Sequence, residues 1–225
     1  MTDRNPVISK HWPLYGLQLM TPRLKLVLPT EEELSELADV TAAGIQAPGQ
    51  ASFLVQWPSL PPAARARAML QRHWQCQAGW SGDDWSLQLA VFADDHVVGL
   101  QELAARDYRI LRQVSTFSWL GVRYQGQGLG TEMRAAVLHL AFAGLAATDA
   151  ISSAFSDNAS SLRVSEKLGY EHDGIERAAS AGRATTSFRL RLSRARWQAH
   201  ARNPVSITGL SPCLPLFGLG EDASP

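Results

Sequence analysis

One stretch of the chain combines glycines with an expected helix start in a pattern suited to binding an anion. It is VRYQGQGLGT, residues 122–131, between an expected strand and an expected long helix. Glycines at alternate positions let the backbone approach a ligand closely. The helix would present its first unpaired N–H groups and its positive dipole end at the same place. The stretch therefore predicts a cradle for a pyrophosphate, although a glycine-rich helix start without a ligand fits the same letters.

Two better-known glycine loops do not match this stretch. A dinucleotide-binding loop, G-x-G-x-x-G, needs a third glycine where this chain has Thr131. A Walker loop ends in Gly-Lys-Ser/Thr, whereas Gly130 is followed by Thr131 and Glu132. We therefore expect neither NAD nor ATP at this loop.

Two motifs in the correct order resemble those of a known family. Arg123-x-x-Gly126-x-Gly128 is similar to the Q/R-x-x-G-x-G/A signature of the GNAT superfamily of acyl-CoA-dependent N-acyltransferases. Residues 158–170 start with Asn and end in Lys-Leu-Gly-Tyr, and they look like that family's second motif. The L-x-T-P-R-L-x-L pattern at 19–26 resembles the RimJ/RimL-type subgroup. The resemblance covers roughly residues 17–192, and two ordered motifs are more specific than either alone.

This resemblance implies an α/β (α+β) fold: a mixed, mostly antiparallel central sheet of six to seven strands with a splayed parallel pair, flanked by helices. Acyl-CoA would enter between the splayed strands, and its pantetheine arm would pair with the freed backbone just before the glycine loop. One strand amide would polarise the thioester carbonyl. The expected CoA-binding residues are Leu120, Gly121, Val122, Arg123, Gly126, Gln127, Gly128, Leu129, Gly130, Thr131, Asn158 and Ser161.

The implied reaction is direct attack of a primary amine on the thioester of acetyl-CoA or another acyl-CoA, without a metal. The acceptor would be a small molecule or a protein N-terminus. In a looser sense the whole chain resembles a succinyltransferase-like branch, which makes succinyl-CoA the alternative donor. A succinyl carboxylate would need a cation deep in the slot, whereas an acetyl group needs only a small apolar end. A third hypothesis is a non-catalytic acyl-CoA-binding sensor.

The catalytic groups depart from the family pattern. The family often places a tyrosine seven residues after the motif's asparagine to protonate the thiolate, and this chain has Ser165 there. A serine is a weaker acid, and it can instead bond to its own helix backbone. Glu102 is the nearest candidate base, with an exposed strand residue as the alternative. Arg134 is expected on a solvated helix face, with contact to the CoA phosphates as the alternative, and Glu132 is expected to support the helix start.

Composition sets limits on the partners. Lys+Arg and Asp+Glu both number 21, so there is no bulk basic excess for binding nucleic acid. Cys76 and Cys213 form neither a disulfide framework nor a metal-binding spacing. The start lacks a signal-peptide pattern, and the longest apolar run, 135–147, is too short to span a bilayer. We therefore expect a cytoplasmic protein with neither a nucleic-acid nor a membrane partner.

Three segments divide the chain. Residues 1–13 are expected as a tail, 14–202 as the acyltransferase domain, and 203–225 as an apolar C-terminal tail. Within the domain, Thr30 and Glu33 predict a capped helix start. The C-terminal tail would pack either on its own domain or on a neighbouring subunit, and it motivates the expectation of a homo-oligomer. A strand is expected at 17–28, with a bend or bulge at Thr21-Pro22, and further strands at 85–92, 97–104, 114–122, 150–155, 170–177 and 185–192. Helices are expected at 30–41, 63–77, 129–145 and 159–168.

Overall fold

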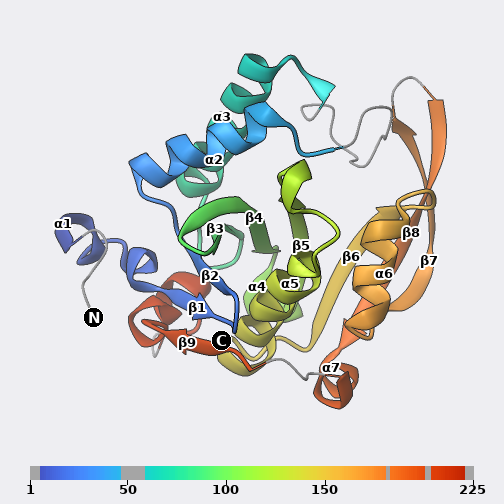
Figure 1. Ribbon diagram of the computed structural model, residues 1–225. Coiled ribbons are helices and arrows are strands. Elements are labelled where there is room, and N and C mark those ends of the chain that lie inside the picture. Colours follow the sequence, from blue (N-terminus) through green and yellow to red (C-terminus); the bar gives the residue numbers. More distant parts are fainter. Residues whose placement is uncertain (1–5, 47–58, 181–182, 201–203, 221–225) are drawn as a thin grey trace.

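A computed structural model describes residues 6–46, 59–180, 183–200 and 204–220 (Figure 1). Within them, one nine-stranded sheet runs in the order β7-β8-β6-β5-β4-β3-β2-β1-β9. Every neighbouring pair is antiparallel except β5 and β6. The strands are β1 Gln18–Met20, β2 Leu24–Val27, β3 Trp85–Ala93, β4 His96–Ala105, β5 Gln113–Leu120, β6 Asp149–Phe155, β7 Glu171–Ser180, β8 Arg183–Ser193 and β9 Ser206–Thr208.

Helices cover both faces of the sheet. The α-helices are α1 Pro6–Ser9, α2 Glu31–Ala43, α3 Pro62–Ala78, α4 Tyr108–Leu111, α5 Leu129–His139, α6 Ala159–Lys167 and α7 Arg194–His200. Shorter helical turns are η1 Pro13–Gly16, η3 Val122–Tyr124 and η5 Ser211–Phe217, and the π-helical η4 Leu140–Gly144 continues α5. The predicted capping box is confirmed, because Thr30 and Glu33 bond to each other's backbone N–H at the start of α2.

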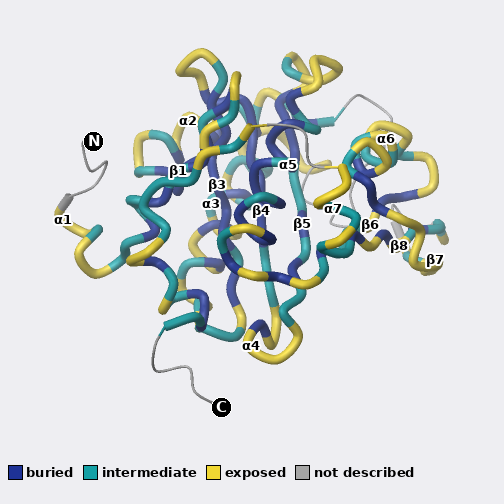
Figure 2. The backbone as a smooth tube through the Cα atoms, turned by 90° about the horizontal axis from the view of Figure 1, so that it is seen from below, coloured by how far each residue is buried: buried dark blue, intermediate teal, exposed yellow. Residues whose placement is uncertain are grey.

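The core divides into two clusters, one on each face. Successive side chains of a strand point to opposite faces, and on β2 Leu26 belongs to one cluster while Val27 belongs to the other. The first cluster takes in Val137 of α5, and the second takes in Leu37 of α2 and Met69 of α3. The central strands are accordingly the most deeply buried part of the chain (Figure 2). Helix α5 therefore lies against one face of the sheet, and α2 and α3 lie against the other.

The parallel pair separates along its length. Strands β5 and β6 are paired only where residues 113–115 meet residues 149–151. Beyond that point β5 continues along β4, and β6 continues along β8. The two strands diverge toward their carboxyl ends, where α5 and α6 begin (Figure 1). This is the splayed pair that the sequence resemblance implied.

The sheet has nine strands, where six to seven were expected. The segment 17–28, expected as one bent strand, forms the antiparallel pair β1 and β2, and the C-terminal segment adds β9. Strand β9 pairs with β1, and Phe217 is fully buried with its ring 4.9 Å from Trp85 and 5.5 Å from Trp80. Of the two predicted placements, the described part of this tail takes the first, on its own domain. The expected homo-oligomer thus loses the observation that motivated it and stays a prediction.

The N-terminal segment is also partly structured. Residues 6–9 form α1, and the Trp12 ring lies 5.9 Å from the Trp80 ring. Residues 1–5 of the predicted tail lie outside the described residues. No helix in the described ranges is long and apolar enough to cross a bilayer.

Candidate active site

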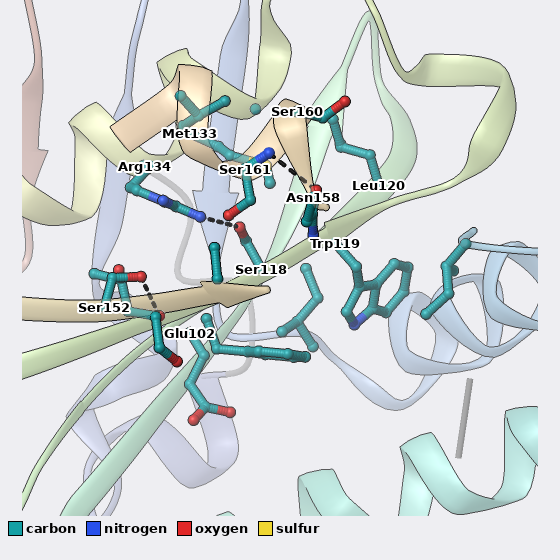
Figure 3. A pocket seen from close by; sticks show the side chains of 18 of the residues that line it. Glu102, Ser118, Trp119, Leu120, Met133, Arg134, Ser152, Asn158, Ser160 and Ser161 are labelled. Carbon is teal, nitrogen blue, oxygen red and sulfur yellow. Dashed lines mark hydrogen bonds between the residues drawn. The ribbon is translucent and has the colours of Figure 1, made fainter. Parts of the chain in front are cut away.

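A single large cavity occupies the splayed region and continues to the α3 face of the sheet. Its volume is about 1240 Å³. Its wall includes the glycine loop, the diverging parts of β5 and β6, the start of α6 and the side of α3 (Figure 3). Among the residues expected to bind CoA, those that line it are Leu120, Gly126, Gly128, Gly130, Thr131, Asn158 and Ser161.

The glycine loop has the geometry of an anion cradle. Gly126 and Gly128 have φ values of +75° and +82°, a left-handed backbone that glycine adopts without strain. Within the described residues, no protein acceptor lies on the backbone N–H groups from Gly126 to Gly128. Leu129 and Gly130 open α5, so their N–H groups also lack an intrahelical partner. The loop therefore offers consecutive unpaired donors at the positive end of a helix.

A carboxylate fixes this loop from outside the cavity. Glu132 accepts hydrogen bonds from Thr21 Oγ1 at 2.6 Å, from Arg23 N at 3.0 Å and from Arg23 Nε at 2.7 Å. Burial acts to raise the pKa of Glu132, but these hydrogen bonds and the Arg23 charge outweigh it and leave the pKa lowered. Glu132 therefore joins α5 to the turn between β1 and β2, in addition to its expected place at the helix start.

The second motif forms the other wall of the slot. Asn158 caps α6, and its Oδ1 accepts a hydrogen bond from Ser161 N at 3.1 Å. Both residues line the cavity, beside Leu120 on the opposite strand (Figure 3). The capping places the amino ends of α5 and α6 on the same cavity.

The expected role of two backbone amides is wrong. Gly121 N donates to Val98 O at 2.9 Å, and Val122 N donates to Gly44 O at 3.0 Å. Because β5 ends at Leu120 and the chain turns into η3, these amides serve the fold and cannot pair with pantetheine. The sequence pattern gave no sign of this turn.

Three further residues of the expected set lie outside the cavity wall. The Arg123 guanidinium lies 4.6 Å from the centre of the Tyr124 ring, on the exposed side of η3. Gln127 holds the loop, because its Nε2 donates to Arg123 O at 3.0 Å. The Leu129 side chain is buried in the core beneath α5. Of these residues, Gln127 and Leu129 keep unpaired backbone N–H groups among the described residues.

Glu102 is buried in the cavity, so its reading as an exposed strand residue is wrong. Its side chain lies on the α3 side, where Gln88 Nε2 donates to Oε2 at 2.6 Å. Arg72 Nη2 of α3 lies 3.4 Å from Oε1. The carboxylate thus faces the part of the cavity that lies away from the glycine loop.

Ser165 is buried but does not line the cavity. Its Oγ donates to Ser161 O at 3.1 Å. Ser165 therefore bonds to its own helix backbone, which was the alternative to the acid role. It also accepts a hydrogen bond from Arg134 Nη1 at 3.0 Å. The serine proton is therefore directed into α6, and the group next to the slot is Arg134.

Arg134 is a functional candidate whose preferred sequence-based reading, a solvated helix face, is wrong. It was expected in solvent, but it is only 6% exposed and lines the cavity. Its Nη2 donates to Ser118 Oγ at 3.3 Å, and its Nε has no partner among the described residues. Burial lowers the pKa of this guanidinium. A signal was available, because Arg134 shares its helix face with the buried residues Val137 and Leu138.

The cavity holds no arrangement of metal ligands in the part of the chain that the structure describes. There, no cluster of three or more His, Cys, Asp or Glu side chains could hold a metal ion. The chemistry that the cavity wall offers is therefore hydrogen bonding through backbone N–H groups and hydroxyls, one buried carboxylate and one buried guanidinium.

Comparison with known proteins identifies the fold and the family. A putative acetyltransferase from T. thermophilus has a similar structure, with a TM-score of 0.66 and 16% identity over 82% of this chain and 93% of its own. A RimL ribosomal-protein acetyltransferase in complex with coenzyme A has a TM-score of 0.62 and 17% identity, over 77% of this chain and 95% of its own. Mycobacterium smegmatis RimJ, in complex with CoA-disulfide, has a TM-score of 0.61 and 14% identity, over 83% of this chain and 94% of its own. The family described as acetyltransferase (GNAT) domain matches residues 23–171, and the chain therefore belongs to the GNAT acetyltransferase family.

Proposed function

We propose that this protein transfers an acyl group from a CoA thioester to a primary amine within a ternary complex. The observation that carries the proposal is the row of unpaired N–H groups from Gly126 to Gly130 at the open end of the splayed strands. A diphosphate placed there would receive several hydrogen bonds and the favourable helix dipole. The rest of CoA would then reach into the slot between β5 and β6.

The free edge of β5 supports a specific path for the pantetheine arm. Alternate residues of a strand direct their backbone groups to the same edge, and Thr116 O faces β6, where it accepts from Ser152 Oγ at 3.5 Å. By the same alternation Ser118 and Leu120 direct their backbone groups toward the slot. Leu120 O already accepts a hydrogen bond from Gln125 Nε2 at 3.0 Å, so only the N–H of Leu120 is proposed for the arm. We therefore propose these two residues, in place of Gly121 and Val122, as the partners of the arm. One of their N–H groups would polarise the thioester carbonyl.

The proposed acceptor amine enters from the α3 side and meets Glu102. An alkyl amine has a pKa of about 10.4, so at neutral pH it arrives protonated and must lose a proton before it attacks. Glu102 would attract the ammonium group and accept that proton, directly or through one water. Holding the two reactants in line can itself lower the barrier by roughly 7–11 kcal/mol, so one modest base is sufficient.

The transfer step then balances as follows. The amine nitrogen bonds to the carbonyl carbon, the C–S bond breaks, and its electron pair leaves on the CoA sulfur. The attacking nitrogen gives up its second proton to that sulfur, directly or through one water, so the products are the amide and CoA thiol. We propose Ser165 as a positioning residue, because its hydroxyl accepts from Arg134 and so fixes that guanidinium beside the slot. The acceptor proposed from the family is a small-molecule amine or a protein N-terminus, and acetyl is the family's default donor group.

Release of free CoA thiol tests the proposal. The protein is incubated with acetyl-CoA or succinyl-CoA and a panel of small amines and peptides with free N-termini. We expect thiol release above the rate without protein with at least one acceptor, and a matching mass increase on that acceptor. If the protein binds acyl-CoA but releases no thiol with any acceptor, the sensor hypothesis replaces the enzyme.

A further inference from the structure

Arg134 is a buried cation without an anionic partner in the described protein. No Asp or Glu of these residues forms an ion pair with it, and its two hydrogen-bond partners are the neutral hydroxyls of Ser118 and Ser165. Burying a guanidinium is costly unless it is paired. Because its Nε is also unpartnered, the side chain keeps an unused donor beside Nη2 in the fork that suits a carboxylate.

Hydroxyl groups lie in the cavity wall near this guanidinium. Ser118 and Ser152 come from the two diverging strands (Figure 3), and Thr116 lines the same cavity. An acetyl methyl group favours a small apolar end, whereas these walls present hydroxyl groups and a positive charge. The wall next to Arg134 is therefore better matched to a charged acyl end than to a methyl.

The position of Arg134 also fits the acyl end of the donor. Arg134 Nη2 lies 3.3 Å from the hydroxyl of Ser118, one of the two residues whose backbone we propose as partners of the pantetheine arm and thioester. Glu102, the proposed base, contacts Arg72 of α3 on the opposite face of the sheet. The cation can thus hold a donor group while the amine approaches from the other side.

Building on the proposed function, we propose that the preferred donor is a CoA thioester whose short acyl chain ends in a carboxylate, and that Arg134 binds this carboxylate. Malonyl, succinyl and glutaryl groups belong to this class. Ser118 and Ser165 hold the guanidinium fork in place. The carboxylate takes no part in bond making, because only the C–N bond forms and only the C–S bond breaks.

Calorimetric titration of the full chain tests this without knowledge of the acceptor. The ligands are succinyl-CoA, butyryl-CoA, which has the same chain length without the charge, and free CoA. We expect the protein to bind succinyl-CoA at least tenfold more tightly than butyryl-CoA. Arg134→Met should abolish this preference while it leaves the affinity for free CoA within about threefold, and Arg134→Lys should retain part of the preference.

A matched control is Arg163→Met, which removes another arginine of the cavity wall, from the exposed side of α6. It should leave the succinyl-to-butyryl ratio unchanged. Equal affinities for the two acyl-CoAs in the unaltered protein would overturn the inference, as would an Arg134→Met variant that weakens all three ligands equally. If Arg134→Met does not fold, the test uses the ratio of the affinities for succinyl-CoA and butyryl-CoA in the unaltered protein and in Arg134→Lys. A ratio of one in the unaltered protein, or a ratio that Arg134→Lys leaves unchanged, would overturn the inference. Failure of free CoA to bind would instead refute the proposed function itself.

Discussion

Glu132 and Arg23 connect the turn between β1 and β2 to the glycine loop. Glu132 Oε2 accepts from Arg23 Nε at 2.7 Å, and Arg23 Nη1 donates to Gln127 O at 3.0 Å. One arginine thus binds the first turn of α5 and the middle of the loop at the same time. Residues more than a hundred positions apart in sequence thereby hold the loop carbonyl away from the cavity.

Glu132→Gln should therefore loosen the loop. The amide keeps the shape but loses the negative charge that receives three hydrogen bonds, and bonds to charged groups contribute about 1.5–3 kcal/mol each. We expect the free energy of unfolding in urea to fall by about 1–3 kcal/mol and the affinity for CoA to fall roughly tenfold. Glu36→Gln, on the exposed side of α2, is the control. Equal free energies of unfolding and equal CoA affinities of Glu132→Gln and Glu36→Gln would contradict the role of Glu132 in holding the loop.

Glu102→Gln should separate catalysis from donor binding. If Glu102 accepts the amine proton, kcat should fall on the order of 100-fold or more, with the affinity for CoA unchanged. The measurement is thiol release with the best acceptor of the panel, together with calorimetric titration of CoA. The exposed Glu166→Gln variant serves as the control. An activity within twofold of the unaltered protein would remove Glu102 from the mechanism.

His73 should make the protein less stable in mild acid. Burial in α3 lowers the pKa of His73 from 6.5 to about 4. Between these values the unfolded chain binds a proton that the folded protein does not, so stability falls as the pH drops from 6.5 to 4. The loss amounts to about 3 kcal/mol. Urea unfolding at several pH values in this range should show that the free energy of unfolding depends less on pH in His73→Leu than in the unaltered protein. The same pH dependence in both proteins would contradict the lowered pKa of His73.

The C-terminal segment should matter for stability within one chain. Phe217 is fully buried against Trp80 and Trp85, and replacing a buried phenylalanine with alanine costs about 3–5 kcal/mol. We expect that loss in urea unfolding of Phe217→Ala, with no change in the mass measured by light scattering. Ile110→Ala, at a residue that is 82% exposed, should stay within about 0.5 kcal/mol. A lower mass for Phe217→Ala would show that the segment joins subunits instead.

Short-range patterns allowed prediction of much of the fold and of the local elements that surround the proposed donor site. The glycine loop, the Asn158 cap and the Thr30 capping box each depend on residues within a few positions of one another, where local backbone physics decides the outcome. The resemblance of two ordered motifs to those of the GNAT superfamily predicted the splayed pair of parallel strands. These elements are present where they were expected.

Long-range contacts decided what the sequence could not show. Arg134 and Glu102 carry charges that usually remain in solvent, and only the packing of α5, α6 and α3 across the sheet buries them. The turn at Gly121 depends on carbonyls from two distant segments, Val98 and Gly44. Strand β9 likewise forms only because its partner β1 has a free edge.

The central claim is that the backbone around Gly128 binds the diphosphate of CoA, and thermal unfolding tests it most directly. At a hundred times its dissociation constant, CoA should stabilise the protein by about 2.7 kcal/mol and raise the Tm by about 5–10 °C. Pantetheine, which lacks the diphosphate, should leave the Tm almost unchanged, and Gly128→Ala should reduce the shift produced by CoA. An unchanged Tm at saturating CoA, or an equal shift with pantetheine, would contradict the account.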